Sequence, residues 1–277
     1  MQSVTFLRTF HLLLCWALLN ILLCVGLNRW ETRTMLERRQ PSRMALSLFA
    51  TGSTNQMEGT DSRSRVILPF RLLSPANASA DERYPLLIFL HGAGEKGDDN
   101  QSQLRGLPEQ MAESSWRTQF PCFLLAPQCP AQSQWTNLDD ELANLIRAVM
   151  KQKQIDPERV YLTGLSMGGY GTWSLATQKP DLFAAVVPIC GGGDPATAER
   201  LVNVPIWAVH GTADRTIPVE QSQRMIAAIR KAGGQANYTE LEGVGHDSWT
   251  QTYRDPGGIL KWMFSQRNRR ISEPAAR

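Results

Sequence analysis

A run of β-forming residues leads directly into a Gly-x-Ser-x-Gly sequence near the middle of the chain. The run covers residues 160–163, and Gly164-Leu165-Ser166-Met167-Gly168 follows it, ahead of a segment with a helical pattern. This arrangement is typical of a sharp strand-to-helix turn that presents a serine hydroxyl above a sheet, and side chains at Gly164 or Gly168 would crowd the turn. The helix N-terminus would direct free N–H groups toward developing negative charge. The alternative is a glycine-rich turn that contains serine by chance, so the surrounding sequence must decide.

Strands and helices are expected to alternate along the chain from about residue 63 to residue 268. Apolar runs predict an edge strand at 65–73 and further strands at 86–90, 120–126, 160–164, 183–190, 205–210 and 236–241. Helical spacing follows several of these runs, for example over residues 138–150. The pattern predicts an α/β fold with a doubly wound, mostly parallel central sheet, helices on both faces and no lid domain.

The first 27 residues have the composition of a targeting segment. Residues 12–27 are apolar except for Asn20, and sixteen residues are short for a membrane span but suit a signal-peptide core. Basic residues follow, as on the cytoplasmic flank of an anchor. We expect an exported protein, periplasmic or extracellular, with this segment either cleaved or kept as an inner-membrane anchor; a buried N-terminal helix is the alternative. Residues 28–62 are expected to be a linker and residues 269–277 a basic tail.

Charge and cysteine content exclude two classes of protein. The net charge of +3 comes from the two basic ends, and the remaining middle of the chain is mildly acidic, which argues against a nucleic-acid surface. Cys122 and Cys129 bracket an expected strand and would lie roughly 20 Å apart, too far for a disulfide. Cys190 ends a different strand. We expect buried thiols and not a disulfide framework.

Three residue types that support nucleophilic catalysis stand at the expected carboxyl ends of strands. Ser166, Asp214 and His246 occur in that order, which is the order of nucleophile, acid and base in α/β-hydrolases. Serine needs an imidazole to take its proton, and a carboxylate orients that imidazole and stabilises its protonated form. The sequence therefore predicts a catalytic triad of Ser166, Asp214 and His246.

Other histidines and acids are weaker candidates for these roles. His91 and His210 each precede a glycine at a strand end, where structural hydrogen bonds under the loops are expected. Asp247 is adjacent to His246 and would rarely reach its ring, whereas Asp194 follows the strand after the serine and stays an alternative acid.

A tetrahedral intermediate needs at least two hydrogen-bond donors for its oxyanion. The backbone N–H groups of Met167 and Ala93 are predicted to supply them, because Met167 follows the nucleophile and Ala93 lies among small residues after the strand that carries His91. No histidine or cysteine pair has metal-ligand spacing, and no phosphate-binding glycine motif follows a strand. The reaction is therefore expected to need neither a metal nor a cofactor.

Together these motifs resemble the α/β-hydrolase superfamily, and specifically the exported bacterial esterases of the dienelactone hydrolase, feruloyl esterase and polyhydroxyalkanoate depolymerase-like group. The resemblance covers about residues 65–266 and rests on the stretches 89–95 with 97–100, 126–128, 164–169, 210–214 and 245–249. It implies a serine carboxylesterase that forms an acyl-enzyme on Ser166. Two alternatives stay open: a serine peptidase of the prolyl-oligopeptidase type, although no propeller domain is present, and an inactive module that binds ligands with the same fold.

The substrate is less well defined by the sequence. Trp135 and Trp249 are candidates to line an acyl or sugar pocket, or else to pack at the rim of the core. Glu95, Asp98 and Asp99 would disfavour anionic substrates, unless this acidic run is simply solvated. We expect a small-molecule or polysaccharide-linked ester as substrate, no nucleic acid partner, and membrane contact only through an uncleaved N-terminal segment.

Overall fold

A computed structural model describes residues 41–54, 68–268 and 270. The expected targeting segment, and the expected basic tail apart from Arg270, lie outside these residues, so export and anchoring stay predictions. Within the described ranges, no helix combines the length and the apolar character that a membrane span requires.

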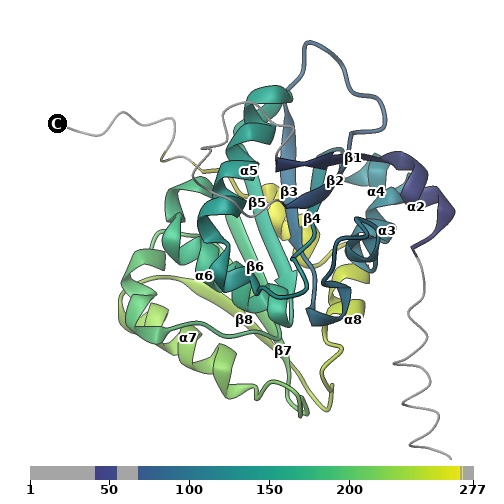
Figure 1. The fold of residues 1–277 in the computed structure, drawn as a ribbon. Helices are drawn as coiled ribbons and strands as arrows, with labels where there is room; N and C mark the ends of the chain where they lie inside the picture. Colours follow the sequence, from purple (N-terminus) through teal and green to yellow (C-terminus); the bar gives the residue numbers. More distant parts are fainter. Residues whose placement is uncertain (1–40, 55–67, 269, 271–277) are drawn as a thin grey trace, which may run out of the picture. The chain divides into compact units, whose positions relative to one another are not determined.

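Eight strands of the described residues form one sheet in the order β1-β2-β4-β3-β5-β6-β7-β8 (Figure 1). The strands from β4 across to β8 are parallel to one another, whereas β2 pairs antiparallel with both β1 and β4. The prediction of a mostly parallel, doubly wound sheet is confirmed. The bounds are β1 Phe49–Ser53, β2 Pro69–Leu73, β3 Tyr84–Leu90, β4 Phe123–Pro127, β5 Ile155–Leu165, β6 Ala185–Ile189, β7 Ile206–Gly211 and β8 Ala236–Leu241.

The N-terminal edge of the sheet differs from the sequence-based expectation. Residues 41–54 fall in the stretch expected to be a linker, yet they contain α2 (Arg43–Leu48) and β1, and β1 pairs with β2 over its whole length. The strand expected at the edge is therefore the second strand of the sheet. Phe49 anchors β1 because its side chain is buried, and Gly52 packs against the ring of Phe70 so closely that a Cβ would overlap it.

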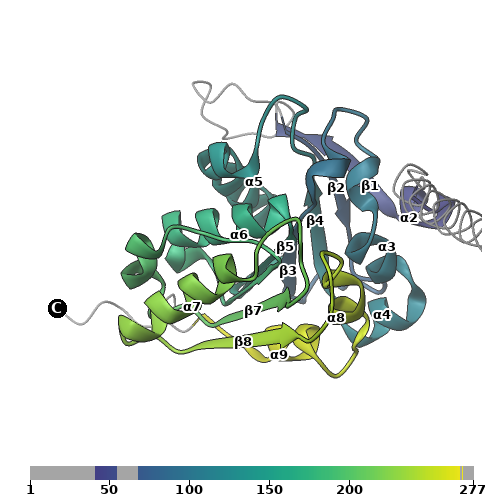
Figure 2. The same cartoon turned by 90° about the horizontal axis from the view of Figure 1, so that it is seen from below.

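Helices cover both faces of the sheet (Figure 2). One face carries α5 (Asp139–Gln152), α6 (Met167–Gln178) and α7 (Glu220–Lys231). The other carries α3 (Leu107–Ala112), α4 (Ser114–Gln119), α8 (Trp249–Arg254) and α9 (Ile259–Ser265). A strand with helices on both sides must be apolar on both faces, and every residue of β3 is buried.

Alternate side chains of β3 divide between the two hydrophobic layers that the described residues form. Leu86, Ile88 and Leu90 join the layer beneath α5, α6 and α7. Leu87 and Phe89 join the opposite layer. This period of two holds the sheet in register, because a slip by one residue would exchange the two faces. The fixed register also fixes the positions of the carboxyl ends of the strands relative to one another, and the polar loops follow these ends.

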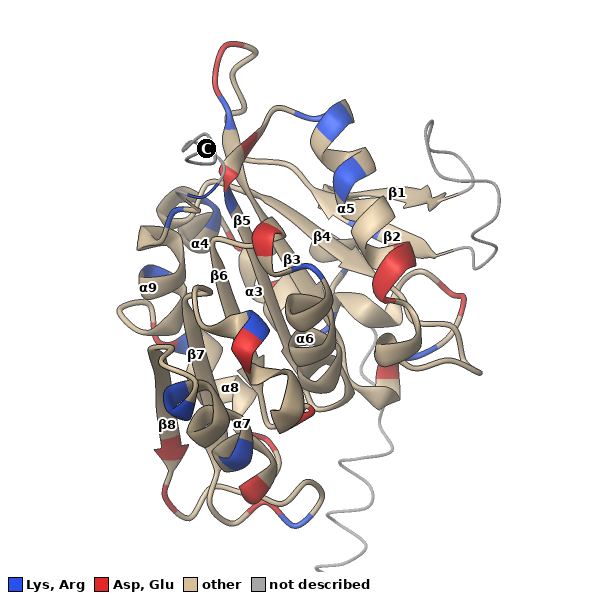
Figure 3. Ribbon diagram, turned by 90° about the vertical axis from the view of Figure 1, so that its left-hand side faces the viewer, with Lys and Arg blue, Asp and Glu red and all other residues tan. Residues whose placement is uncertain are grey.

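Helices α5 and α7 carry charged residues of both signs, while strands β3 and β6 carry none (Figure 3). Helix α5 shows the arrangement well, with Asp139, Asp140 and Glu141 in its first turn and Lys151 in its last. Acidic residues near a helix N-terminus and basic residues near its C-terminus both complement the helix dipole.

Candidate active site

Ser166 occupies the turn between β5 and α6 in a left-handed backbone conformation, with φ 55° and ψ −117°. Its N–H donates to the carbonyl of Ile189 at 3.0 Å, which ties the turn to the end of β6. The two flanking glycines are required by close approach: a Cβ at Gly164 would overlap the carbonyl of Gly168, and a Cβ at Gly168 would overlap the carbonyl of Leu90. The sequence motif therefore folds as the strained turn expected for it.

The structure brings Ser166, Asp214 and His246 together in one hydrogen-bonded line. The hydroxyl of Ser166 lies 2.9 Å from Nε2 of His246, and Nδ1 of His246 lies 2.7 Å from Oδ2 of Asp214. Asp214 comes from the loop after β7 and His246 from the loop after β8, so the parallel sheet places all three at the same edge. This is the geometry in which an imidazole can remove a proton from a serine while a carboxylate fixes its tautomer.

The side chain of Asp214 is shielded from solvent but well supplied with donors. Its Oδ1 accepts hydrogen bonds from the N–H groups of Thr216 and Ile217 at 2.8 and 2.9 Å. Burial by itself would raise the pKa of this carboxyl, but the hydrogen bonds from His246 and from these two amides outweigh it, and the pKa lies below its ordinary value. Asp214 is therefore ionised at neutral pH.

The alternative acids lie in other hydrogen-bond networks. Asp194 is exposed and caps the 3₁₀ helix over Pro195–Leu201 by accepting from the N–H of Ala196 at 3.0 Å. Asp247 accepts from both the N–H and the hydroxyl of Thr250.

The two predicted oxyanion donors are each the first residue of a helix. Met167 is the first residue of α6, and Ala93 is the first residue of the 3₁₀ helix Ala93–Glu95. An N–H at the first position of a helix has no partner within that helix. A Cβ built on the neighbouring Gly92 would lie only 3.8 Å from the Cβ of Ser166, so this loop passes directly beside the serine.

His91 holds this loop through structural hydrogen bonds, which is the role expected for it from the sequence. Its ring is buried, with Nδ1 2.6 Å from the carbonyl of Gly92 and Nε2 accepting from the N–H of Cys129 at 3.0 Å. Burial lowers the pKa of His91 to about 4, because a charged imidazole would lose its hydration. A neutral ring with its proton on Nδ1 satisfies both contacts.

Sequence reasoning did not detect a polar network that holds the same loop. Gln128, fully buried at the end of β4, donates to the carbonyl of Glu95 and to the carboxylate of Asp99, and it accepts from the N–H of Asn100. Asp99 also accepts from the hydroxyl and the N–H of Ser102. Burial opposes ionisation of Asp99, but these bonds outweigh it and lower its pKa to about 2. The expected solvated acidic run is thus partly structural.

The two tryptophans have different environments. Trp135 is fully buried and donates from Nε1 to the carbonyl of His91 at 3.0 Å, so it is a core residue and not a pocket wall. Trp249 is half-buried, and its ring meets that of His246 edge-on with centroids 5.3 Å apart. It also lines a groove of about 620 Å³ between α3, α4 and α8, a volume in the range of small-molecule sites. Other residues along this groove include Met44, Leu107, Trp116 and Tyr253.

The three described cysteines are buried free thiols, in agreement with the expectation of no disulfide framework. Burial raises the pKa of Cys122 and Cys190 to about 12 and that of Cys129 to about 11, so all three stay protonated at neutral pH. Among the described residues, Cys190, Asp214 and His246 form the one cluster of three close metal-ligating groups. Two of them already share the hydrogen bond of the proposed triad.

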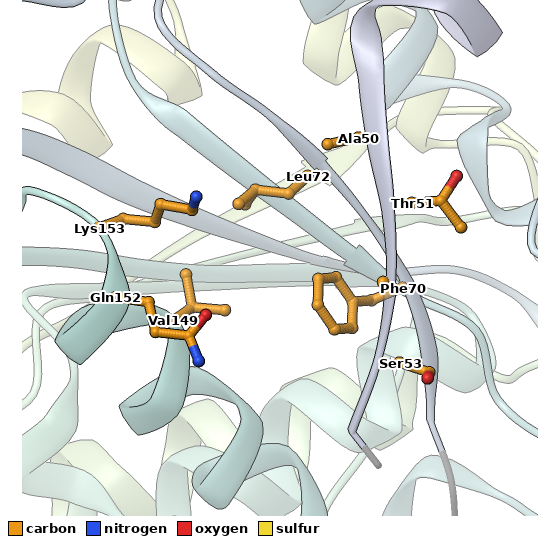
Figure 4. A pocket seen from close by; sticks show the side chains of 9 residues that line it. Ala50, Thr51, Ser53, Phe70, Leu72, Val149, Gln152 and Lys153 are labelled. Carbon is orange, nitrogen blue, oxygen red and sulfur yellow. The ribbon is translucent and has the colours of Figure 1, made fainter. Parts of the chain in front are cut away.

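A further cavity lies away from the serine. It has a volume of about 190 Å³ and is bounded by β1, β2 and the end of α5 (Figure 4). Phe70 and Val149 supply apolar surface, and Gln152 and Lys153 stand at its side. None of the residues that line it belongs to the proposed triad.

The strained serine turn and the parallel sheet define an α/β-hydrolase fold, and comparisons with known proteins agree. Residues 128–265 match the Dienelactone hydrolase family, and the chain therefore carries a Dienelactone hydrolase family domain. The crystal structure of a thermostable esterase superposes with a TM-score of 0.74 at 37% identity, over 81% of this chain and 64% of that one. An acylaminoacyl peptidase of Pyrococcus horikoshii superposes with a TM-score of 0.56 at 18% identity, over 75% of this chain and 40% of that one, which is a likeness of fold.

Curated relatives carry esterase names. A bifunctional acetylxylan esterase/xylanase of Neocallimastix patriciarum is 27% identical over 70% of this chain and 29% of its own length. A probable feruloyl esterase C of Aspergillus oryzae is 27% identical over 64% of this chain and 67% of its own length. The chain thus spans less than a third of the first relative and about two thirds of the second.

Proposed function

We propose that this chain is a serine carboxylesterase that hydrolyses esters through an acyl-enzyme on Ser166. The observation that carries the proposal is the continuous line of hydrogen bonds from Ser166 through His246 to the ionised Asp214. The family match and the esterase names of the relatives support ester bonds as the target.

The proposed reaction has two halves. The Ser166 oxygen attacks the ester carbonyl while Nε2 of His246 takes its proton, and the N–H groups of Met167 and Ala93 bind the oxyanion. The tetrahedral intermediate collapses as His246 returns the proton to the leaving alcohol. Water then attacks the acyl-enzyme with the same assistance, releasing the carboxylic acid and restoring Ser166.

The groove beside Trp249 supports a substrate with an aromatic or sugar group. An indole can stack on such rings, and the groove volume of about 620 Å³ accommodates one. The esterase names of the relatives mention feruloyl and acetylxylan groups, so methyl ferulate and acetylated xylan are the first esters to examine.

The test compares the wild-type protein with Ser166→Ala. Wild-type protein should hydrolyse p-nitrophenyl acetate and butyrate and react with a fluorophosphonate probe at Ser166. The variant should lose the label and on the order of 10⁶ in kcat. Full activity in the variant would refute the proposal. The peptidase alternative, favoured only by the fold likeness, predicts cleavage of an acylated peptide that exceeds ester hydrolysis.

A further inference from the structure

His210 is a buried histidine that the proposed reaction does not use. It lies in β7, four residues before Asp214, and its side chain is fully shielded from solvent. Its Nε2 lies 2.9 Å from the carbonyl of Ile217 and 3.3 Å from Oδ2 of Asp214. Oδ2 is the same oxygen that contacts Nδ1 of His246. Both histidine rings therefore face one carboxylate oxygen.

The proton on Nε2 of His210 can be assigned from its neighbours. A carbonyl oxygen and an ionised carboxylate both accept hydrogen bonds and cannot donate them. Nε2 must therefore carry a hydrogen, which it donates to the carbonyl of Ile217, and the same nitrogen lies 3.3 Å from Oδ2 of Asp214. In this way the ring holds the backbone of the loop 214–217 and lies against the side chain of Asp214.

The opposite edge of the ring is fixed by helix α7. Nδ1 of His210 lies 2.8 Å from the hydroxyl of Ser222, and this hydroxyl also lies 2.9 Å from the carbonyl of Gly191. Ser222 is fully buried. Because Ser222 and Ile217 hold the ring from its two edges, the imidazole cannot turn away from Asp214 without breaking buried hydrogen bonds.

Two other titratable groups near Asp214, on α6 and after β6, do not change charge across the assay range. Tyr170 on α6 and Cys190 after β6 both respond to the charge of Asp214. Burial raises the pKa of the Tyr170 hydroxyl above its usual value and that of the Cys190 thiol to about 12. Between pH 5 and 9 both therefore stay neutral, so neither adds a change of charge beside Asp214.

We propose that His210 is a positioning residue that donates a hydrogen bond to Asp214 and thereby sets the orientation and basicity of His246. The inference rests on the proposed triad. With this donor present, the negative charge on Oδ2 is shared between two N–H groups. Without it, His246 alone faces the charge and should hold its own proton more tightly.

A matched pair of variants separates this role from simple packing. In His210→Gln the amide nitrogen can reach the position of Nε2 and keep the donor to Asp214. In His210→Asn the shorter amide can reach only the position of Nδ1 and keeps the contact with Ser222. The experiment measures kcat/KM for p-nitrophenyl butyrate from pH 5 to 9, with thermal melts of both variants.

We expect the acidic limb of the His210→Asn profile to move upward by about 0.5 to 1 pH unit, with kcat about tenfold lower. His210→Gln should keep the limb of the wild-type protein. Identical limbs in both variants and the wild type would overturn the proposal, even if both variants were less stable. Equal shifts in both variants would overturn it as well.

A measurement on the wild-type protein covers the case in which a variant does not fold. Two-dimensional ¹⁵N–¹H spectra of histidine-labelled protein should show that Nε2 of His210 carries a hydrogen throughout pH 6 to 9. An unprotonated Nε2 would exclude the hydrogen bond to Asp214. Measuring Asp214→Asn in parallel distinguishes a failure of the triad from a failure of the role given to His210. If Asp214→Asn keeps full activity, the proposed triad is wrong. If Asp214→Asn is inactive but the acidic limbs of the His210 variants do not move, only the role of His210 is refuted.

Discussion

The indole of Trp135 donates a hydrogen bond to the backbone carbonyl of His91 at 3.0 Å, and the two rings meet edge-on with centroids 4.9 Å apart. This contact fixes the end of β3 at the point where the chain enters the loop of Gly92 and Ala93. Helix α6 packs against the same tryptophan so closely that a Cβ at Gly171 would overlap the Cβ of Trp135. Trp135 therefore links the nucleophile helix to the proposed oxyanion loop.

Trp135→Phe should destabilise the protein by about 2 kcal/mol, because the buried carbonyl of His91 loses this donor and a small void is left. The kcat for p-nitrophenyl butyrate should also fall, since the loop that carries Ala93 loses a support. Urea unfolding and steady-state kinetics measure the two effects. Trp262→Phe is the control, because Trp262 is half-buried on α9, packs edge-on against Trp207 and does not line the groove. Similar small losses in both variants would contradict the assigned role.

Asp214→Asn should preserve the fold and reduce kcat by about 10³- to 10⁴-fold, because an amide favours the wrong imidazole tautomer. Asp194→Asn and Asp247→Asn should each leave kcat within about tenfold, since their carboxylates contact Ala196 and Thr250 and not the ring of His246. Thermal melts beside the kinetics distinguish lost catalysis from lost stability. A large loss at Asp194 with little at Asp214 would move the acid to the loop after β6.

The parts of the site that the sequence predicts are those that local rules determine. Glycine spacing around Ser166 reflects steric exclusion within one turn, so it is visible in five consecutive letters. The carboxyl ends of parallel strands lie at one edge of the sheet, which is why the order of Ser166, Asp214 and His246 already indicated proximity.

The parts that the sequence does not predict depend on contacts between distant segments. Strand β1 is short, and only Phe49 in it is buried, so no periodicity separates it from a linker. Trp135 became a core residue because the carbonyl of His91, 44 positions away, accepts its N–H. The buried amide of Gln128 organises Asp99 across a separation of 29 residues. A single sequence carries no local signal for such pairs.

Trp249→Ala should lower kcat/KM for methyl ferulate by about tenfold and leave ethyl acetate hydrolysis nearly unchanged. The reason is that Trp249 lines the groove and its ring also contacts that of His246, and only the larger ester would reach into the groove. Both substrates can be followed in a pH-stat. Trp262→Ala serves as the control, because Trp262 packs against Trp207 and does not line the groove. Equal losses on both esters would show that Trp249 acts on the position of His246 and not on the substrate.

Asp139→Asn should make the protein more stable at pH 8 and leave its stability at pH 3 almost unchanged. Asp139 begins α5, and its Oδ2 accepts from the hydroxyl of Ser174 at 2.6 Å while its Oδ1 is buried without a partner. Burial, only partly offset by the Ser174 bond, raises the pKa of this carboxyl to about 6. The folded state therefore binds its proton more tightly than the unfolded state, for which the reference value is 3.8.

The stability that this proton supplies is fully present below pH 3.8 and is lost as the pH rises through about 6. An uncharged Asn avoids the loss, and since the carboxyl is only partly buried, solvent screening limits the gain at pH 8 to about 1 kcal/mol. Urea unfolding at pH 3, 6 and 8 measures it. Asp140→Asn is the control: this exposed neighbour pairs with Lys179 at 2.8 Å, which lowers its pKa, so its removal should not stabilise the protein at pH 8. If the difference in stability between the wild-type protein and Asp139→Asn did not change with pH, the raised pKa of Asp139 in the folded state would be contradicted.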